Sequence, residues 1–361
     1  MKILTVVGAR PQFIKAAAVS HKLRKVHNEI LVHTGQHYDY SMSEQFFEEL
    51  DIPRPEYNLG ISGGSHAQMT GKMLIAIEEI LQKEKPDMVL LYGDTNSTLA
   101  GALAAAKLHI PICHVEAGAR THCMTNPEEI NRICTDHVSS ILLASTESGL
   151  EELEKEGLSD KAVFVGDPMY DAFVEYSTYK NPADVSITPL FGEEKISIPE
   201  RFYYLTCHRE ENSNDKALTE ILSAMEQLEG HTIYPAHPRN KERAKQIVDK
   251  KGFKNIILTE PVGYLDSIAL MRACEGVVTD SGGLQREAFF AGKKCVTVLD
   301  FVVWPETMVG NRNQLAKPDV MDIVNKMNNS MEINDDYQPF GDGHAAQKIV
   351  EAIDSWNTGE T

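Results

Sequence analysis

Short apolar runs alternate with longer amphipathic stretches along the first half of the chain. Each run has four to six residues and is rich in Val, Ile and Leu, whereas apolar positions in the longer stretches recur with helical spacing. The predicted strands are 3–7, 29–33, 88–92, 110–115 and 140–143, and the predicted helices are 13–24, 67–81, 98–108 and 128–137. Strands that alternate with helices predict a parallel sheet covered on both faces.

The alternation stops in a polar stretch, residues 179–199, and then starts again. The predicted strands of the second half are 202–206, 232–234, 256–258, 276–279 and 294–298, and its predicted helices are 216–228, 240–250, 265–273 and 283–290. We therefore predict an α/β protein with two doubly wound, Rossmann-like domains, residues 1–167 and 168–339, joined around 165–176. The segment 340–361 carries a final helix, 344–356, which we expect to pack back on the first domain.

Composition narrows the classes of partner. The chain of 361 residues contains 35 Lys and Arg and 53 Asp and Glu. The resulting net charge of −18 opposes binding to nucleic acid or to an anionic membrane. No apolar run approaches the roughly 20 residues of a membrane-spanning helix, and we expect no signal peptide. The six cysteines include no C-x-x-C pair, which predicts a reduced, cytoplasmic protein without disulfides.

The first predicted strand ends in a turn that carries two cations. Gly8 permits the turn, Pro11 suits the start of a helix, and Arg10 and Lys15 can face an anion there. Taken alone, a plain turn with two solvated cations explains this segment better. The chain lacks G-x-G-x-x-G and G-x-x-x-x-G-K-[ST], so we predict no nucleotide cofactor.

Three acids follow other strands of the first half. Asp94 comes after strand 88–92, where capping a helix is its commoner role, and Glu128 can simply complement a helix dipole. Glu116 directly follows an apolar run and belongs at a strand end rather than on a solvated face. Carboxylates that lie together raise one another's pKa values, which prepares a general acid or base.

The same stretch is rich in cysteine and histidine. These residues are Cys113, His114, His122, Cys123, Cys134 and His137. Their spacing matches no zinc-ligand pattern, so we predict no metal site.

The second half places histidines and a Gly-rich turn after its strands. His208 follows strand 202–206 as a candidate acid or phosphate donor, or as a loop cap. His237 follows strand 232–234 in a second pair of His and Arg and is a candidate UDP-binding residue. Ser281, Gly282 and Gly283 lie between a strand and a helix, where free amides favour an anion. A plain turn is the alternative for that segment.

Glu287 lies further along the same predicted helix and could accept hydrogen bonds from a ribose diol. Together these residues indicate a nucleotide-linked substrate, with its diphosphate on the second domain and its reacting group in the first. We expect the ligand between the two domains.

Several motifs, in the order in which they occur along the chain, resemble those of the non-hydrolysing UDP-N-acetylglucosamine 2-epimerase family. They are Gly8-x-Arg10-Pro11, Thr34-Gly35-Gln36-His37, Gly93-Asp94-Thr95, His114-Val115-Glu116-Ala117-Gly118, Pro127-Glu128-Glu129-x-Asn131-Arg132, His208-Arg209 and Asp280-Ser281-Gly282-Gly283. The resemblance implies a glycosyltransferase-B-like fold, a UDP-sugar substrate in the inter-domain cleft, no cofactor and a homodimer. It also implies inversion at C2 by elimination of UDP to a glycal and re-addition, in envelope polysaccharide synthesis.

The resemblance also implies roles for individual residues. Asp94, Glu116 and Glu128 match catalytic acids and bases, and His208 matches a residue near the diphosphate. The positions that match UDP or sugar binding are Arg10, Lys15, Ser281, Gly282, Glu287 and Arg132.

The sequence departs from the family pattern at several positions. Gln12 replaces a glutamate, and Ala119 replaces a bulkier residue. Leu299, Val302 and Val303 stand where the family has an arginine and a Thr-Glu pair. The Gly8–Gln12 and Tyr38-Asp39 segments resemble the branch that acts on UDP-2,3-diacetamido-2,3-dideoxy-glucuronate, and that sugar is the alternative substrate.

Three other functions stay open on the sequence. A glycosyltransferase could share the fold, although the three acids argue against it. An inactive UDP-sugar-binding relative is suggested by the apolar residues at Leu299, Val302 and Val303. A hydrolysing epimerase would release free UDP.

Overall fold

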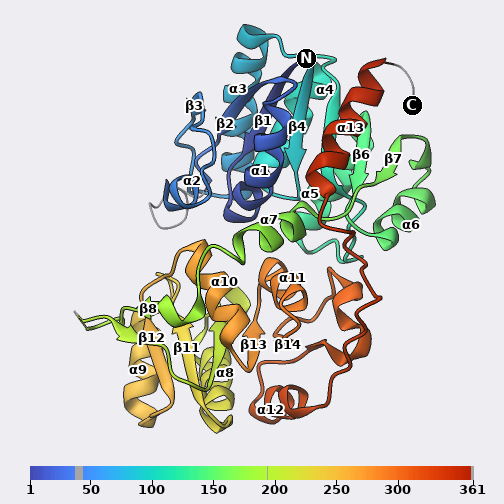
Figure 1. Ribbon diagram of the computed structural model, residues 1–361. Coiled ribbons are helices and arrows are strands. Elements are labelled where there is room, and N and C mark those ends of the chain that lie inside the picture. The colour runs from blue at the N-terminus through green and yellow to red at the C-terminus, as the bar shows by residue number, and fades with distance from the viewer. Residues whose placement is uncertain (37–43, 193, 359–361) are drawn as a thin grey trace. The chain divides into compact units, whose positions relative to one another are not determined.

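The computed structural model describes residues 1–36, 44–192 and 194–358, and its chain forms two compact units (Figure 1). The first unit contains the described parts of Met1–Val174 and Gln338–Thr361, and the second contains those of Glu175–Tyr337. Each unit has its own parallel sheet, so the two-sheet α/β architecture expected from the sequence is confirmed.

The sheet of the first unit has seven parallel strands in the order β3-β2-β1-β4-β5-β6-β7. The strands are β1 (Lys2–Val7), β2 (Asn28–His33), β3 (Tyr57–Asn58), β4 (Met88–Tyr92), β5 (Ile112–Ala117), β6 (Ile141–Ala144) and β7 (Ala162–Phe164). The chain moves outward from β1 to β3 and then returns to place β4 on the other side of β1. In an open parallel sheet, such a reversal is where ligands bind.

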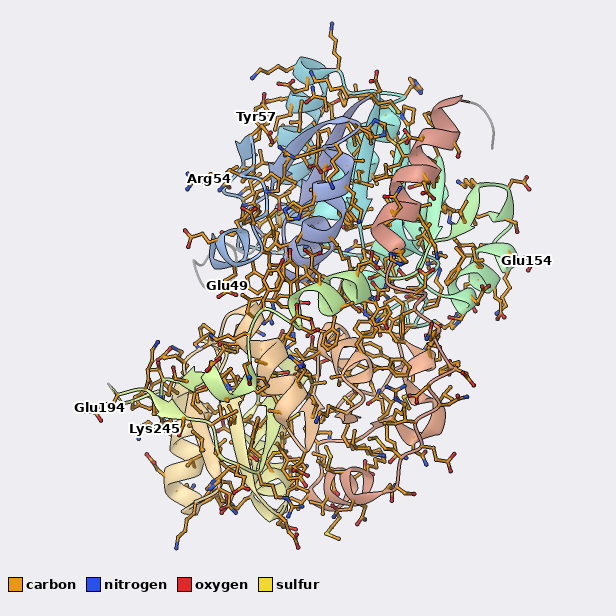
Figure 2. All side chains as sticks on the ribbon, in the orientation of Figure 1. Glu49, Arg54, Tyr57, Glu154, Glu194 and Lys245 are labelled. Carbon is orange, nitrogen blue, oxygen red and sulfur yellow. The ribbon has the colours of Figure 1, made fainter. Side chains whose placement is uncertain are left out.

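Helices cover both faces of this sheet. They are α1 (Arg10–Leu23), α2 (Glu44–Glu49), α3 (His66–Glu84), α4 (Asn96–Lys107), α5 (Pro127–Val138), α6 (Glu147–Lys155) and α13 (Ala345–Thr358), with the short 3-10 helix η2 (Ser159–Lys161). Helix α7 (Pro168–Tyr176) contains the point at which the chain passes from the first unit to the second. Leu4 and Val6 of β1 face α3 and α4, as alternate residues of a strand must. Tyr57 on the edge strand, labelled in Figure 2, donates a hydrogen bond to Glu84 of α3.

The C-terminal helix belongs to the first unit. Helix α13 packs against α1 (Figure 1), and the backbone amides of Ala345 and Ala346 donate to the carboxylate of Asp171 at 3.0 and 2.7 Å. Since Asp171 accepts these bonds at the start of the helix, it fixes where the returning chain begins to coil. The expected return of the last helix to the first domain is confirmed.

The second unit repeats the same topology with six parallel strands, in the order β12-β11-β10-β13-β14-β15. The strands are β10 (Phe202–Thr206), β11 (His231–Pro235), β12 (Ile256–Thr259), β13 (Gly276–Thr279), β14 (Lys294–Thr297) and β15 (Asn313–Leu315). The helices are α8 (Asp215–Gln227), α9 (Lys241–Lys251), α10 (Tyr264–Ala273), α11 (Gly282–Phe290) and α12 (Val320–Asn328), with the 3-10 helices η3 (Pro182–Asp184), η4 (Glu210–Asn212) and η5 (Pro305–Asn311).

Alternate residues of β10 enter two different cores. Tyr203 and Leu205 pack with α8, α9 and α12, whereas Phe202 and Tyr204 pack with α10 and α11. A strand that is apolar on both sides has no alternating pattern, which is why its sequence reads as a continuous apolar run. The reversal of this sheet lies between β10 and β13.

Some elements differ from the sequence prediction. The polar stretch 179–199 holds a small antiparallel pair, β8 (Ser186–Ile187) and β9 (Ile196–Ser197), where no strand was predicted. The short elements β3, β7 and α2 were also missed, because a segment this short shows no clear period. Helix α6 was missed although its nine residues are amphipathic. No helix among the described residues is long and apolar enough to cross a membrane.

Candidate active site

The candidate residues of the first unit lie after adjacent strands. Arg10 follows β1 and Asp94 follows β4, which are the two strands at the reversal of the sheet. Glu116 lies near the end of the neighbouring strand β5. The carboxyl ends of parallel strands share one edge, so the fold brings these residues together.

Lys15 and Glu116 form a buried ion pair. Only 2% of the Lys15 side chain and 6% of the Glu116 side chain are exposed. Gly93, directly before Asp94, is next to both, because a Cβ atom built on it would lie 3.3 Å from Lys15 Nζ and 3.5 Å from Glu116 Oε1. The structure therefore gathers Lys15, Glu116 and the Gly93–Asp94 turn.

The backbone at Glu116 is strained. Its φ angle is +72°, in the left-handed region that residues other than glycine and asparagine rarely occupy. The register between β5 and β6 shifts at this point, between Val115 and Ala117. Such a conformation costs about 1–2 kcal/mol and persists only where the surroundings impose it, often at functional sites.

Gln12 joins two turns of this site. Its Oε1 accepts from the backbone N–H groups of Gly8 and Ala9 at 2.8 and 3.1 Å, and its Nε2 donates to the Tyr92 carbonyl at 2.7 Å and to Thr98 Oγ1 at 2.9 Å. A side-chain amide supplies both an acceptor and a donor, whereas an ionised glutamate supplies only acceptors. The glutamine at position 12, which stands where the family has a glutamate, therefore matches the donors and acceptors around it.

Asp94 is held by helix α5. Its carboxylate pairs with Arg132, and its carbonyl accepts from Asn131 Nδ2 at 2.8 Å. The N-cap of α4 is Thr95, whose hydroxyl accepts from the Thr98 amide, so capping is not the role of Asp94. Burial opposes the charge of Arg132, but the carboxylates of Asp94 and Glu129 raise its pKa.

The two adjacent acids Glu128 and Glu129 have different environments. Glu129 is buried and accepts from the backbone amides of Thr121 and His122, with Arg132 Nη1 at 2.9 Å from its Oε2. Burial alone would raise the pKa of Glu129, but these donors lower it. Glu128 is half-buried in the first turn of α5. Glu129 is therefore committed to these backbone amides and to Arg132.

Arg10 begins α1 beside an aromatic ring. It is half-buried, and its guanidinium carbon lies 5.0 Å from the centre of the Phe46 ring on α2. A cation above an aromatic face gains about 0.5–1 kcal/mol at an exposed site. The neighbouring motif residue His37 and the pair Tyr38-Asp39, which carried part of the resemblance, lie outside the described residues.

In the second unit, His208 and Asp280 form the counterpart pair after β10 and β13. His208 Nδ1 lies 2.8 Å from Asp280 Oδ1, and the backbone amides of His208 and Arg209 also donate to that carboxylate. Burial would raise the pKa of Asp280, but His208 and the two amides lower it to about 2. Asp280 thus orients the imidazole of His208, whose side chain is 43% exposed.

Other candidates surround this pair. The ring centre of His237 lies 6.2 Å from that of His208, and its Nδ1 accepts from the Arg239 amide at 3.2 Å. Ser281 caps α11 by accepting from the Leu284 amide at 3.3 Å. Gly282 and Gly283 lie in the first turn of that helix and are half-buried. Glu287 is buried further along α11.

The residues that depart from the family pattern border the same turn. Leu299 and Val303 are buried, and Val302 is half-buried. They belong to the loop between β14 and η5, which ends at Trp304. A Cβ atom added to Gly282 would lie 3.7 Å from the indole nitrogen of that tryptophan. The apolar substitutions therefore pack a loop that adjoins the Gly-rich turn.

No three His, Cys, Asp or Glu side chains within residues 1–36, 44–192 and 194–358 are grouped as a metal site requires. His114 instead uses both ring nitrogens within the protein, 2.6 Å from Asp136 Oδ1 and 2.7 Å from the Gly93 carbonyl oxygen. The partner Asp136 was not singled out from the sequence, and Glu129 was noted only beside Glu128 in a shared motif. Asp136 lies on the inner face of an amphipathic helix, among positions that are usually apolar. The one sequence signal that could have identified it is an acid at such a position.

Comparison with known proteins gives full-length matches. The sequence profile described as UDP-N-acetylglucosamine 2-epimerase matches residues 21–354. The UDP-2,3-diacetamido-2,3-dideoxy-D-glucuronate 2-epimerase of Pseudomonas aeruginosa is 45% identical, covering 98% of this chain and 99% of that protein. A Methanococcus maripaludis protein named UDP-N-acetylglucosamine 2-epimerase homolog is 44% identical with the same coverage.

A solved structure has the same fold over nearly the whole chain. The Methanocaldococcus jannaschii UDP-GlcNAc 2-epimerase, crystallised in complex with UDP-GlcNAc and UDP, has a TM-score of 0.87 at 37% identity. The match covers 98% of this chain and 99% of the other. The glycosyltransferase-B-like fold implied by the resemblance is thereby confirmed.

Proposed function

Since the chain belongs to the UDP-N-acetylglucosamine 2-epimerase family, we propose that it inverts C2 of UDP-N-acetylglucosamine to give UDP-N-acetylmannosamine. The family reaction is that of a non-hydrolysing isomerase that acts on UDP-sugars. The observation that carries the proposal is the first-unit group of Lys15, Glu116 and the Gly93–Asp94 turn, which places buried acid/base side chains at the reversal of a parallel sheet.

The proposed chemistry is elimination followed by addition. A carboxylate removes the proton from C2 as the C1–O bond to UDP breaks, which leaves a C1=C2 double bond in a bound glycal. UDP then adds back to C1 while a proton is delivered to C2 from the opposite face. The C2 proton is weakly acidic, so the enzyme must both position a base and stabilise the leaving diphosphate.

We assign the proton transfers to the first unit. Glu116 and Asp94 adjoin Gly93, and each is held by a cation, Lys15 or Arg132. Glu128 is the third proposed acid, because its neighbour Glu129 is committed to backbone amides and to Arg132. Two carboxylates that act from different sides of C2 are needed to invert its geometry.

We assign the diphosphate mainly to the second unit. The amides of Gly282 and Gly283 at the start of α11 suit its charge, and His208, oriented by Asp280, can donate to it. Ser281 and His237 adjoin these groups, and Arg10 and Glu287 complete the proposed contacts with UDP. In this role, the second unit holds the nucleoside diphosphate in place and stabilises the negative charge that develops on it as it leaves C1.

A second candidate substrate is UDP-2,3-diacetamido-2,3-dideoxy-glucuronate. The Pseudomonas aeruginosa relative that bears this activity in its name is 45% identical to the chain. Leu299, Val302 and Val303 also replace polar family residues in the loop beside the Gly-rich turn, which favours a sugar other than UDP-N-acetylglucosamine.

We further propose that the protein is a cytoplasmic homodimer that serves envelope polysaccharide synthesis. Analytical ultracentrifugation of the full chain tests the number of subunits.

The test is to incubate the purified protein with each UDP-sugar alone and to follow the products by NMR. We expect one of the two sugars to be converted into its C2 epimer, with UDP still attached. Stoichiometric free UDP with a free epimeric sugar would identify a hydrolysing epimerase instead. Binding without any product would identify an inactive relative, and turnover only with an added acceptor would identify a glycosyltransferase.

A further inference from the structure

Four buried or half-buried side chains form a connected polar network next to Glu116 and the Gly93–Asp94 turn. His114 lies on β5, Asp136 on α5, Arg120 after β5 and Glu156 after α6. His114 and Asp136 are completely buried. Arg120 Nη2 lies 2.7 Å from Asp136 Oδ2, and its Nε lies 2.8 Å from Glu156 Oε1.

His114 uses both ring nitrogens in this network. Its Nε2 faces the carbonyl oxygen of Gly93 at 2.7 Å, and its Nδ1 faces Asp136 Oδ1 at 2.6 Å. A carbonyl can only accept, so Nε2 donates to Gly93, and His114 and Arg120 lower the pKa of Asp136 against the opposing effect of burial. The imidazole thus joins the turn before Asp94 to helix α5.

Asp136 holds the chain on both sides of Glu116, through His114 of β5 and through Gly118 directly after that strand. It accepts from His114, two residues before, and from the backbone amide of Gly118, two residues after, at 3.1 Å. The residue between them is the one with the left-handed φ of +72°. The same helix also holds Asp94, through Asn131 and Arg132.

We propose that Asp136, acting through His114, is a positioning residue that fixes Glu116 and the Gly93–Asp94 turn relative to each other. This inference rests on the proposed function. Neither side chain needs to touch the substrate, because the network sets the geometry of the groups that do. A misplacement of a reacting group by about 1 Å can cost on the order of 100-fold in rate.

The main variant is Asp136→Asn, which keeps the shape of the side chain. Its side-chain amide has a single acceptor oxygen, and its nitrogen only donates. It therefore cannot bond to His114 through one atom and accept from Gly118 and Arg120 through the other. His114→Gln is the second variant. Its single amide nitrogen can serve Gly93 or Asp136 but not both, so we expect a smaller loss.

The matched control is Glu29→Gln. Glu29 is also a buried carboxylate of the first unit, and it accepts from Thr5, Ser20 and Arg24 at 2.7, 2.9 and 2.7 Å. It lies on β2, away from the network. Glu154→Gln, on the exposed surface of α6 (Figure 2), controls for loss of a charge alone.

The experiment measures kcat, KM and UDP binding of the full chain at a temperature at which all variants are folded. We expect kcat of Asp136→Asn to fall about 10- to 100-fold, with KM and the calorimetric Kd for UDP within about threefold of the wild type. The kcat of His114→Gln should lie between the kcat of Asp136→Asn and that of the wild type. The kcat of both control variants should stay within about twofold of the wild type. If Asp136→Asn does not fold, His114→Gln alone decides.

Two results would overturn the inference. One is an unchanged kcat in the folded Asp136→Asn or His114→Gln variant. The other is a crystal structure of either variant in which Glu116 keeps its left-handed backbone and its place beside Lys15 and Gly93. A wild-type protein that turns over neither UDP-sugar would instead refute the proposed function, and the crystal structure would still decide the positioning role.

Discussion

Lys15 and Glu116 neutralise each other in an almost fully buried ion pair beside Gly93. A buried charge that loses its partner is costly, so the two residues must be considered together. Lys15 was grouped with the anion-binding residues on the sequence, and the structure adds a carboxylate partner. The pair links helix α1, which begins at Arg10, to the strand that carries the proposed base.

Glu116→Gln should abolish epimerisation while UDP binding persists. The amide cannot take a proton, so we expect a loss of at least about 100-fold in kcat. The variant also leaves the Lys15 cation buried without a carboxylate, which should destabilise the fold by about 3 kcal/mol. Kinetics, calorimetry with UDP and urea unfolding measure the three effects.

The double variant Lys15→Met, Glu116→Gln provides the control. It contains no buried charge at this position and should recover most of the lost stability, yet remain inactive. Wild-type turnover in Glu116→Gln would remove this residue from the mechanism.

Glu128 and Glu129 should respond oppositely to the same substitution. Glu128→Gln should lower kcat by at least about 100-fold and change the free energy of unfolding by less than about 0.5 kcal/mol. Glu129→Gln should destabilise the protein by about 1–3 kcal/mol, because its carboxylate accepts from two backbone amides and pairs with Arg132. Kinetics and urea unfolding of both variants check this, and a fully active Glu128→Gln would contradict the assignment.

Asp280 should make the stability of the protein depend on pH in the acid range. Its pKa is about 2 in the folded protein against an ordinary 3.8, so its carboxylate stabilises the fold above pH 3.8. That contribution, about 2 kcal/mol, disappears as the pH falls toward 2. Asp280→Asn should therefore be less stable than the wild type at pH 6, and the difference should shrink below pH 4. Urea unfolding across this range measures it, and a difference that does not change with pH would refute the account.

Gln12→Glu should destabilise the fold although it restores the residue common in the family. The new carboxylate would face the Tyr92 carbonyl, to which the Gln12 amide now donates at 2.7 Å. Loss of that donor should cost about 1–3 kcal/mol at neutral pH. Urea unfolding at pH 7.5 measures the cost, and equal stability would show that the amide donor is dispensable.

Much of the fold follows from the sequence because long buried strands leave a strong signal. The apolar run 88–92 is strand β4 residue for residue, and the last helix was expected at 344–356 and runs from Ala345 to Thr358. Strand β5 starts two residues later than predicted, at Ile112 rather than 110, because Pro111 cannot donate to a neighbouring strand.

The partners of the site residues were beyond the reach of the sequence. Ion pairs such as Lys15 with Glu116 join residues about 100 positions apart, and only the strand order brings them together. The division of labour between Glu128 and Glu129 depends on which one faces the loop at Thr121, which a pair of adjacent acids does not reveal. The buried Asp136 likewise carries no local signature.

Transfer of solvent hydrogen to C2 tests the central claim most directly. The purified protein would be incubated in D2O with UDP-N-acetylglucosamine and, in parallel, with UDP-2,3-diacetamido-2,3-dideoxy-glucuronate, and C2 would be examined by NMR and mass spectrometry. We predict one deuterium at C2 of the epimer formed from one of the two sugars. Recovery of both sugars without deuterium at C2 would contradict proton transfer by Asp94, Glu116 and Glu128.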